Sequence, residues 1–405
     1  MKLGDIANEG AQQYGKPLDG VRVLAAEQMQ ALPYATQLLA RMGADVVKVE
    51  HPGRGDEARA WGPSFFEGGS VMFFAANRSK RSLALDFKDE AGRAALLRLV
   101  DGADVFVQSL REGTAERLGL GSGALRGRND RLVYCSIRAF GRNGPLASEP
   151  GYDPLMQAFA GLISITGEPG RPGVRIGASV VDIGTGVWAA LGIIAALLER
   201  ATTGRGRDVG VALYDTALSL VGYQLTAVLK TGVVPGRHGT AFPLIVPYEV
   251  FATSDGELMI AAANDRLFRL LCERIGHPEL ADDARFLTNP DRLVNREQLL
   301  PEIRERLACD TSGHWLEQLA GIPVAPVQDL ATAGAHPQTR ANGMLQEVDG
   351  VDAVASPLQV DEERLEHRLP PPLLGAHSVE VLRELGYDDA DIDALVQRGI
   401  VGSPA

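Results

Sequence analysis

The segment Val180-Val181-Asp182-Ile183-Gly184-Thr185-Gly186 places a carboxylate between a short apolar run and a glycine-rich stretch. We expect the apolar run to end a strand and the glycines to begin a helix, so that Asp182 faces the backbone amides of the helix start. Those amides would keep Asp182 ionised and could hold an oxyanion, and a nucleophilic aspartate requires both. The alternative is that Asp182 or Thr185 only caps the helix, and the segment by itself favours that role.

A second polar group, Gly151-Tyr152-Asp153 followed by Gln157, comes about thirty residues earlier. A tyrosine and an aspartate at the start of a helical pattern suit a binding site. They suit equally a helix cap with a packed aromatic ring, which is the more common role of such residues.

Basic residues are concentrated at expected strand ends and loops of the first third of the chain. The formal net charge of −12 opposes non-specific binding to nucleic acid or to an anionic membrane, so an anionic ligand would have to be held by a local group of cations. Such a group would suit a phosphorylated cofactor, although most surface cations are simply solvated. The candidates are Lys48, Arg54, Arg59, Lys80, Arg81, Lys88, Arg111 and Arg117.

Other common site types find no support in the sequence. Gly119-Leu-Gly-Ser-Gly follows a helical pattern and is better explained as a turn than as a dinucleotide-binding loop. The chain has no phosphate-loop, nucleophile-elbow or zinc-helix motif, and its seven histidines are scattered. We therefore expect no metal.

The elements that must position these residues alternate between strands and helices from Val21 onward, which predicts a parallel α/β, doubly wound architecture. Two apolar runs around Ser254-Asp255-Gly256 predict an antiparallel hairpin, and helical patterns follow to about residue 320. We expect a large Rossmann-like domain over residues 1–225, a small α+β domain over 226–330, and a C-terminal arm over 331–405 that returns to the large domain.

The cysteines and the longest apolar run indicate in which cellular compartment the protein works. Cys135, Cys272 and Cys309 are an odd number, lie far apart, and are expected to be buried thiols. The longest apolar run, 187–198, is too short to span a bilayer and is expected to be a buried helix. We expect a cytoplasmic protein.

Taken together, these segments resemble the family III CoA transferases, which include formyl-CoA transferase, carnitine CoA transferase and, as a branch, α-methylacyl-CoA racemase. The similarity runs from about Pro17 to the C-terminus, and many motifs occur in family order. They are Gly20-Val-Arg-Val-Leu, Leu39-Ala-Arg-Met-Gly-Ala-Asp-Val-Val-Lys-Val-Glu, Lys80-Arg-Ser-Leu-Ala-Leu-Asp-Phe-Lys, Gly151-Tyr-Asp, Val181-Asp-Ile-Gly-Thr-Gly, Thr203-Gly-Arg-Gly, Val246-Pro-Tyr, Gly321-Ile-Pro-Val-Ala-Pro-Val and Pro372-Leu-Leu-Gly-Ala-His.

The resemblance implies an interlocked homodimer, coenzyme A as the acyl-carrying co-substrate, and Asp182 as the nucleophile. It implies that Gln30 contacts the thioester region. Where formyl-CoA transferase has an arginine, an asparagine and a phenylalanine, this chain has His51, Ser109 and Leu110. The positions implied to line the CoA site are Gln30, Ala31, His51, Leu85, Lys88, Ser109, Leu110, Arg111, Arg117, Tyr152 and Asp153.

The resemblance also implies a mechanism in which Asp182 forms a mixed anhydride with the acyl group and then an aspartyl-CoA thioester. Members of the racemase branch have a Gly-His-Asp where this chain has Gly151-Tyr152-Asp153, and tyrosine is a poor proton shuttle at neutral pH. CoA transfer is therefore favoured, with a racemase or a non-catalytic CoA-binding protein as the alternatives.

The acceptor acid is indicated only weakly. The stretch from Arg237, His238 and Gly239 to Pro243 stands where formyl-CoA transferase has a longer glycine-rich loop over the active site. A shorter cover with these basic side chains would suit a small dicarboxylate, or they are solvated loop residues.

Overall fold

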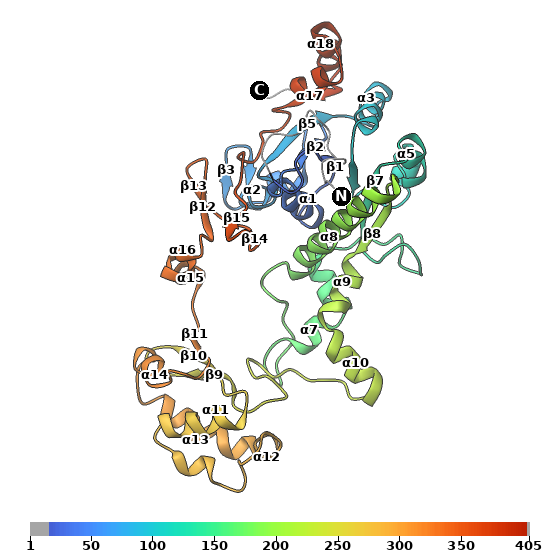
Figure 1. Ribbon diagram of the computed structural model, residues 1–405. Coiled ribbons are helices and arrows are strands. Elements are labelled where there is room, and N and C mark those ends of the chain that lie inside the picture. Colours follow the sequence, from blue (N-terminus) through green and yellow to red (C-terminus); the bar gives the residue numbers. More distant parts are fainter. Residues whose placement is uncertain (1–15, 403–405) are drawn as a thin grey trace. The chain divides into compact units, whose positions relative to one another are not determined.

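The computed structural model describes residues 16–402, which form two compact units (Figure 1). The larger unit contains residues 16–162, 176–226 and 340–402, and the smaller contains 163–175 and 227–339. Residues 163–175, which were predicted in the large domain, belong to the smaller unit.

A seven-stranded sheet is the centre of the larger unit, in the order β16-β5-β2-β1-β6-β7-β8. Six strands are parallel, and β16 at one edge is antiparallel to β5. Counted in chain order the parallel strands run 3-2-1-4-5-6, so the order reverses between β1 and β6. The predicted parallel α/β architecture is therefore confirmed. The strands are β1 (Arg22–Ala26), β2 (Asp45–Glu50), β5 (Lys80–Leu85), β6 (Val105–Gln108), β7 (Val133–Arg138), β8 (Asp208–Ala212) and β16 (Val401–Gly402).

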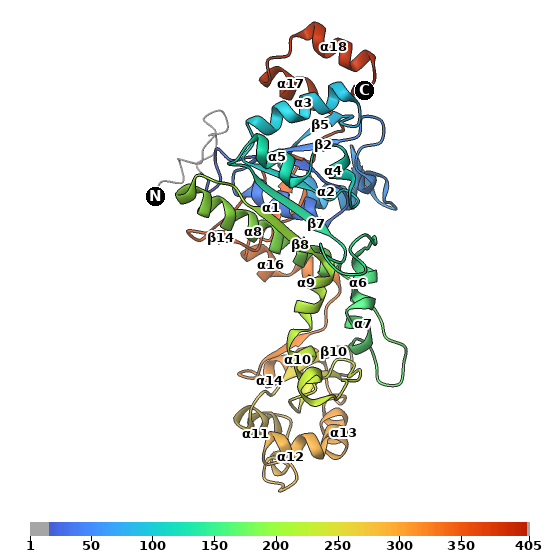
Figure 2. The same ribbon diagram turned by 90° about the vertical axis from the view of Figure 1, so that its right-hand side faces the viewer.

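Helices cover both faces of this sheet (Figure 2). Strand residues such as Leu24, Val47 and Phe106 share a core with α3 (Glu90–Asp101), α5 (Ser122–Arg128), α17 (Ser378–Glu384) and α18 (Asp389–Gln397). The alternate strand residues are buried on the opposite face, where α1 (Ala31–Arg41) and α8 (Val180–Thr203) pack together and against the sheet. The burial of both faces explains why these strands are continuously apolar.

Helix α8 differs from its prediction in two ways. No strand precedes it, and its 24 residues make it long and apolar enough to cross a membrane by length and composition alone. A core helix of a soluble protein meets the same criterion, and α8 packs against α1, β7 and β8. It is nevertheless not buried all round, because one stripe is 45% to 55% exposed: Val187, Trp188, Leu191 and Leu198.

The remaining elements of the larger unit connect or edge the sheet. Between β2 and β5 lie η3 (Glu57–Ala60), β3 (Phe65–Phe66), β4 (Gly69–Ser70) and α2 (Val71–Asn77), and α4 (Thr114–Arg117) follows β6. Helices α6 (Asp153–Phe159) and α9 (Leu213–Leu220) contact α8, while α7 (Leu162–Ile165) and α10 (Gly222–Thr231) each begin in the larger unit and end in the smaller one. The C-terminal part adds two hairpins, β12 (Leu345–Val348) with β13 (Val351–Val354) and β14 (Gln359–Val360) with β15 (Glu363–Arg364).

The smaller unit has its own core under a three-stranded sheet of β9 (Tyr248–Ala252), β10 (Glu257–Ala261) and β11 (Val324–Pro326). Strands β9 and β10 pair antiparallel around the predicted turn, so the predicted hairpin is confirmed. Cys272 is buried in this core, but Cys309 is exposed, contrary to prediction. The helices are α11 (Asp265–Arg274), η4 (Pro278–Ala281), α12 (Asn289–Val294), α13 (Arg296–Leu307), α14 (Ser312–Gln318), α15 (Leu330–Ala335) and α16 (Pro337–Ala341).

Candidate active site

Asp182 lies in the first turn of α8, as the third residue of the helix. The residue before the helix, Ser179, makes no side-chain cap. The Thr185 hydroxyl donates to the Val181 carbonyl at 2.7 Å and lies 2.9 Å from the Thr216 hydroxyl, so it does not cap the helix either.

The cap comes from Asp153, at the start of α6. Its Oδ2 accepts hydrogen bonds from the backbone amides of Val181 at 2.7 Å and Asp182 at 3.2 Å. Its Oδ1 accepts one from Gln157 Nε2 at 2.6 Å, and Gln157 Oε1 accepts one from the Ile176 amide at 2.8 Å. Because Asp153 fills the capping role, the carboxylate of Asp182 is left for another use.

The same arrangement overturns the predicted electrostatics of Asp182. Burial of its carboxylate and the neighbouring charge of Asp153 raise its pKa to about 7. The amides expected to hold Asp182 ionised are occupied by Asp153, so they cannot serve as the oxyanion donors either. A carboxylate with a pKa near neutrality is more basic than an ordinary aspartate, and pKa values displaced in this way are concentrated at functional sites.

Glycine brings the start of α8 against the start of α1. A Cβ at Gly186 would lie 2.6 Å from the carbonyl oxygen of Ala31, closer than real side-chain atoms approach. This close contact places the first turn of α8, with Asp182, beside the N-terminus of α1, which begins directly after Gln30. The structure thus places Gly186, one helical turn after Asp182, against Ala31, the residue that follows Gln30.

Most of the other predicted CoA-site residues follow the carboxyl ends of the four neighbouring strands β5, β2, β1 and β6. The backbone amide of Gln28 donates a hydrogen bond to Ser109 Oγ at 3.3 Å. This bond joins the loops after β1 and β6, at the point where the strand order reverses. Ligands of open α/β sheets bind at this point. The residues gathered along this edge are Gln30 and Ala31 after β1, His51 after β2, Leu85 and Lys88 at and after β5, and Ser109, Leu110 and Arg111 after β6.

The candidate cations fall into two groups. Lys48 and Lys80 are completely buried, with Lys48 Nζ 2.8 Å from Asp56 and Lys80 Nζ 2.8 Å from Glu27. Arg59 pairs with Glu50, and Arg81 with Asp45, Glu380 and Glu384. The prediction that these four could hold a phosphate is therefore wrong. The others are exposed and form no ion pair among the described residues: Arg54, Lys88, Arg111 and Arg117.

The buried charges have a structural role that the sequence did not reveal. Asp56, held by Lys48, accepts the backbone amide of Met29 at 3.0 Å. Met29 has φ +70°, a conformation that side-chain-bearing residues seldom adopt. The network thus holds the loop that ends at Gln30. A lysine inside each apolar strand was the signal that could have found it, since buried lysines need a carboxylate partner.

Not every predicted side chain points to a ligand. Leu85 is fully buried and Asp153 is 1% exposed, so neither residue is open to a ligand in this structure, contrary to their predicted place in the CoA site. His51 Nδ1 accepts the amide of Gly53 at 3.1 Å, whereas Tyr152 is 50% exposed.

Arg237, His238 and Gly239 lie in the smaller unit and are not among the residues gathered at the sheet edge. Arg237 donates to the Ser164 carbonyl at 3.3 Å, and the Gly239 amide donates to the Gly167 carbonyl at 2.9 Å. Residues 163–175 therefore support the loop that was predicted to face the acceptor acid.

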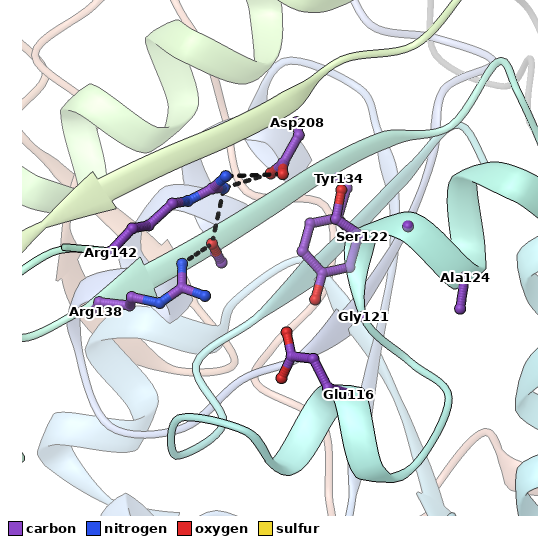
Figure 3. A pocket seen from close by; sticks show the side chains of 10 residues that line it. Glu116, Gly121, Ser122, Ala124, Tyr134, Arg138, Arg142 and Asp208 are labelled. Carbon is purple, nitrogen blue, oxygen red and sulfur yellow. Dashed lines mark hydrogen bonds and ion pairs between the residues drawn. The ribbon is translucent and has the colours of Figure 1, made fainter. Parts of the chain in front are cut away.

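A cavity of about 380 Å³ is lined by residues of β7, β8 and the segment 116–124 (Figure 3), and Asp182 is not among its lining residues. Arg142 and Arg138 line it, but they pair with Asp208 at 2.5 Å and with Glu112 at 2.7 Å. Its cations are thus neutralised, and it does not suit an anionic cofactor. Within residues 16–402, no group of three His, Cys, Asp or Glu side chains is placed to hold a metal ion.

Comparison with known proteins agrees with this arrangement. Residues 18–378 match the family described as CoA-transferase family III, and the chain belongs to that family; it is a CoA-transferase. It is 38% identical to a succinate–glutarate CoA-transferase of Agrobacterium fabrum, over 91% of this chain and 96% of that protein. It is 36% identical to an acetyl-CoA:oxalate CoA-transferase of Acetobacter aceti, over 92% and 97%. The crystal structure of a CAIB/BAIF family protein from Brucella suis is similar, with a TM-score of 0.84, 38% identity, and coverage of 92% and 100%.

Proposed function

We propose that the protein moves CoA from a dicarboxylic acyl-CoA to a second dicarboxylic acid through covalent intermediates on Asp182. The observation that carries the proposal is the carboxylate of Asp182 itself. It is released from helix capping by Asp153, is raised in pKa to about 7, and lies beside the loop of Gln30.

The reaction begins when an ionised Asp182 oxygen attacks the donor thioester carbonyl. The C–S bond breaks, CoA leaves as the thiolate, and a mixed anhydride of the acyl group and Asp182 remains. The thiolate then attacks the Asp182 carbonyl carbon and expels the donor carboxylate, which leaves an aspartyl-CoA thioester. The acceptor carboxylate repeats the two steps in reverse and regenerates Asp182. No proton is gained or lost overall, and one thioester replaces another.

Each residue of the site has a definite task in this scheme. Asp153 orients the first turn of α8 and keeps Asp182 basic, which favours attack. The side-chain amide of Gln30 is the donor available to the developing oxyanion, and one such donor is worth roughly 3 kcal/mol. Lys88 and Arg111, exposed after β5 and β6, and Arg117, exposed at the end of α4, would bind the phosphates of CoA.

A dicarboxylic acceptor is supported by the names of the relatives, which specify succinate, glutarate and oxalate, while the donor named for the oxalate enzyme is acetyl-CoA. A small, doubly charged acid needs a cation for the carboxylate that does not react. Arg237 and His238 are the candidates, because they lie on the loop predicted to cover the acceptor. A panel of mono- and dicarboxylic acids with succinyl-CoA as donor tests this point. Equal rates with acetate and with succinate or glutarate would reject the dicarboxylate assignment.

The covalent step is tested by mass measurement after incubation with succinyl-CoA and by trapping with hydroxylamine. The natural enzyme should carry an adduct on Asp182. Asp182→Ala should carry none, and should lose turnover by at least about a thousandfold while it still binds CoA. The exposed aspartate of α18, changed as Asp393→Ala, is the matched control and should behave as the natural enzyme. Turnover retained in Asp182→Ala would reject the proposal, and so would epimerisation of a 2-methylacyl-CoA without free acid.

We also propose that the enzyme is an interlocked homodimer. The exposed stripe of α8 continues on the following helices with Leu220 and Tyr223, which are 47% and 57% exposed. A continuous apolar surface of this kind is typical of a protein–protein contact. Light scattering after size exclusion should give twice the chain mass, and Trp188→Glu should shift it to the monomer. A natural chain that elutes as a monomer at micromolar concentration would refute the dimer.

A further inference from the structure

Two arginines of the larger unit are buried in contact with the same carbonyl group. Arg41 is the last residue of α1 and Arg78 follows α2, and each is 3% exposed. Their Nη2 atoms donate hydrogen bonds to the carbonyl of Val354 in β13, at 3.0 Å and 3.2 Å. Two positive charges therefore meet inside the protein on one neutral acceptor.

The other buried cations of the described chain are arranged differently. Arg200 lies 2.8 Å from Asp104 and Arg292 lies 2.7 Å from Asp265, while Lys48 and Lys80 each contact a carboxylate. No carboxylate among residues 16–402 forms an ion pair with Arg41 or Arg78. Because a buried charge is costly unless an opposite charge compensates it, this pair stands apart.

Several donors of this cluster also lack acceptors. The Nε atoms of Arg41 and Arg78 are buried without a hydrogen-bond partner. Arg41 Nη2 lies 2.5 Å from His367 Nε2, and because a guanidinium only donates, Nε2 must accept. The ring of His367 is also hydrogen-bonded to the backbone of Val354, and its Nδ1 atom is buried without a partner. Two guanidinium N–H groups and one ring nitrogen without partners thus come from three separate segments of the chain.

The titration of these groups agrees with an uncompensated positive charge. Burial lowers the pKa of Arg41 to about 10, and burial together with Arg41 lowers the pKa of Arg78 to about 9. Burial and the two arginines lower the pKa of His367 to about 3, so its ring is neutral at pH 7. An anion bound among them would reverse each of these shifts.

We propose that Arg41, Arg78 and His367 form a binding site for one small oxyanion, a phosphate or a carboxylate. The planar guanidinium fork matches the oxygen pairs of both. The ligand must be small, because the chain itself covers Arg41 and Arg78 almost completely and leaves no surface for a macromolecule. Bound there, the anion joins the C-terminal segments at Val354 and His367 to α1 and α2. The site is separate from Asp182 and does not depend on the proposed reaction.

The test uses the full-length protein in chloride, to which phosphate, sulfate or succinate is added at constant ionic strength. We expect a saturable rise in Tm with a site-binding oxyanion, on the order of 3 to 5 °C at a hundredfold excess over Kd. Titration calorimetry should give one site per chain. The Tm rise in phosphate is compared with the Tm rise in succinate. A larger rise in phosphate indicates an inorganic anion as the ligand, and a larger rise in succinate indicates a free acid of the substrate class. The absence of any saturable response overturns the proposal.

Variants locate the site. Arg41→Gln and Arg78→Gln should each weaken anion binding at least tenfold. Arg200→Gln is the matched control, since it removes a buried arginine that has a carboxylate partner, and its anion response should equal that of the natural chain. An unchanged response in both Arg41→Gln and Arg78→Gln would overturn the proposal. The N-terminal segment carries two carboxylates, Asp5 and Glu9. If the chain responds to added anions only after Asp5→Asn and Glu9→Gln, these carboxylates are the ligand of the arginines, and the proposal is overturned.

Discussion

Asp153→Asn is the most informative single change in the site. In the natural chain one carboxylate oxygen accepts two amides of α8 and the other accepts Gln157 Nε2. An asparagine has only one accepting oxygen, so its NH2 group must face either the two amides or the Gln157 amide. If Gln157 rotates to accept, it turns its own NH2 group toward the Ile176 amide. Every arrangement therefore leaves a buried donor unpaired.

The magnitude follows from these contacts. An unpaired buried donor costs about 1–3 kcal/mol. Loss of the negative charge at the start of α8 costs roughly a further 0.3–1 kcal/mol. We therefore expect the free energy of unfolding to fall by about 1–4 kcal/mol, measured by urea denaturation at pH 5, where Asp182 is protonated and its repulsion by Asp153 does not contribute.

The pH dependence of catalysis should change as well. The attacking species is the ionised Asp182, so kcat/KM of the natural enzyme rises with pH through about 7. Asp153→Asn removes the neighbouring charge but not the burial, so the rising limb moves to lower pH. Since both enzymes are fully ionised at pH 8.5, any rate difference there reports the positioning and basicity of Asp182.

The same pKa sets the sign of a stability change. Folding raises the pKa of Asp182 from 3.8 to about 7, so its contribution to stability is complete below pH 3.8 and is lost as pH rises through 7. The loss should be smaller in Asp153→Asn. Asp393→Asn, an exposed change on α18, should alter neither profile. A rising limb that stays near pH 7 in Asp153→Asn, or moves upward, would refute the coupling of the two carboxylates.

Three further predictions concern the surroundings of the site. Gly186→Ala should destabilise the chain by about 1–3 kcal/mol and lower kcat, because the new Cβ meets a backbone oxygen. Gly127→Ala, in open space on α5, should stabilise the chain by up to about 1 kcal/mol. Thermal melts and initial rates compare the two variants, and equal melting temperatures would contradict the close contact at Gly186. Lys80→Met should cost about 3–5 kcal/mol in urea denaturation because it removes the closest cation to the buried carboxylate of Glu27, and an unchanged midpoint would disprove this. Three exposed cations are each replaced by Gln: Lys88, Arg111 and Arg117. Each change should raise KM for acyl-CoA several-fold at low salt without lowering kcat. Lys230→Gln is the control, and an unchanged KM in the three variants would contradict the prediction.

The elements that could be predicted are those whose pattern is local. The apolar strands and the helices between them predicted the parallel architecture, and the Ser254-Asp255-Gly256 turn predicted the hairpin of the smaller unit. The strand expected before Asp182 was wrong, because Val180 and Val181 are apolar for a different reason: Val181 packs in the core as part of α8. A two-residue apolar run cannot distinguish a strand end from a helix start.

The charged residues show most clearly what only the tertiary structure decided. The resemblance to a known family implied that Asp182 and Gln30 belong to a site, whereas the segment around Asp182 by itself favoured a helix cap. The sequence could not tell that Asp153 would take the amides of α8, or that Lys48 and Lys80 would be buried with carboxylates while Lys88 and Arg111 stay in water. Whether a charge serves a ligand, a helix end or another side chain depends on which groups lie within a few ångströms of it. Residues far apart in the chain supply those neighbours, so folding decides among roles that the sequence leaves open.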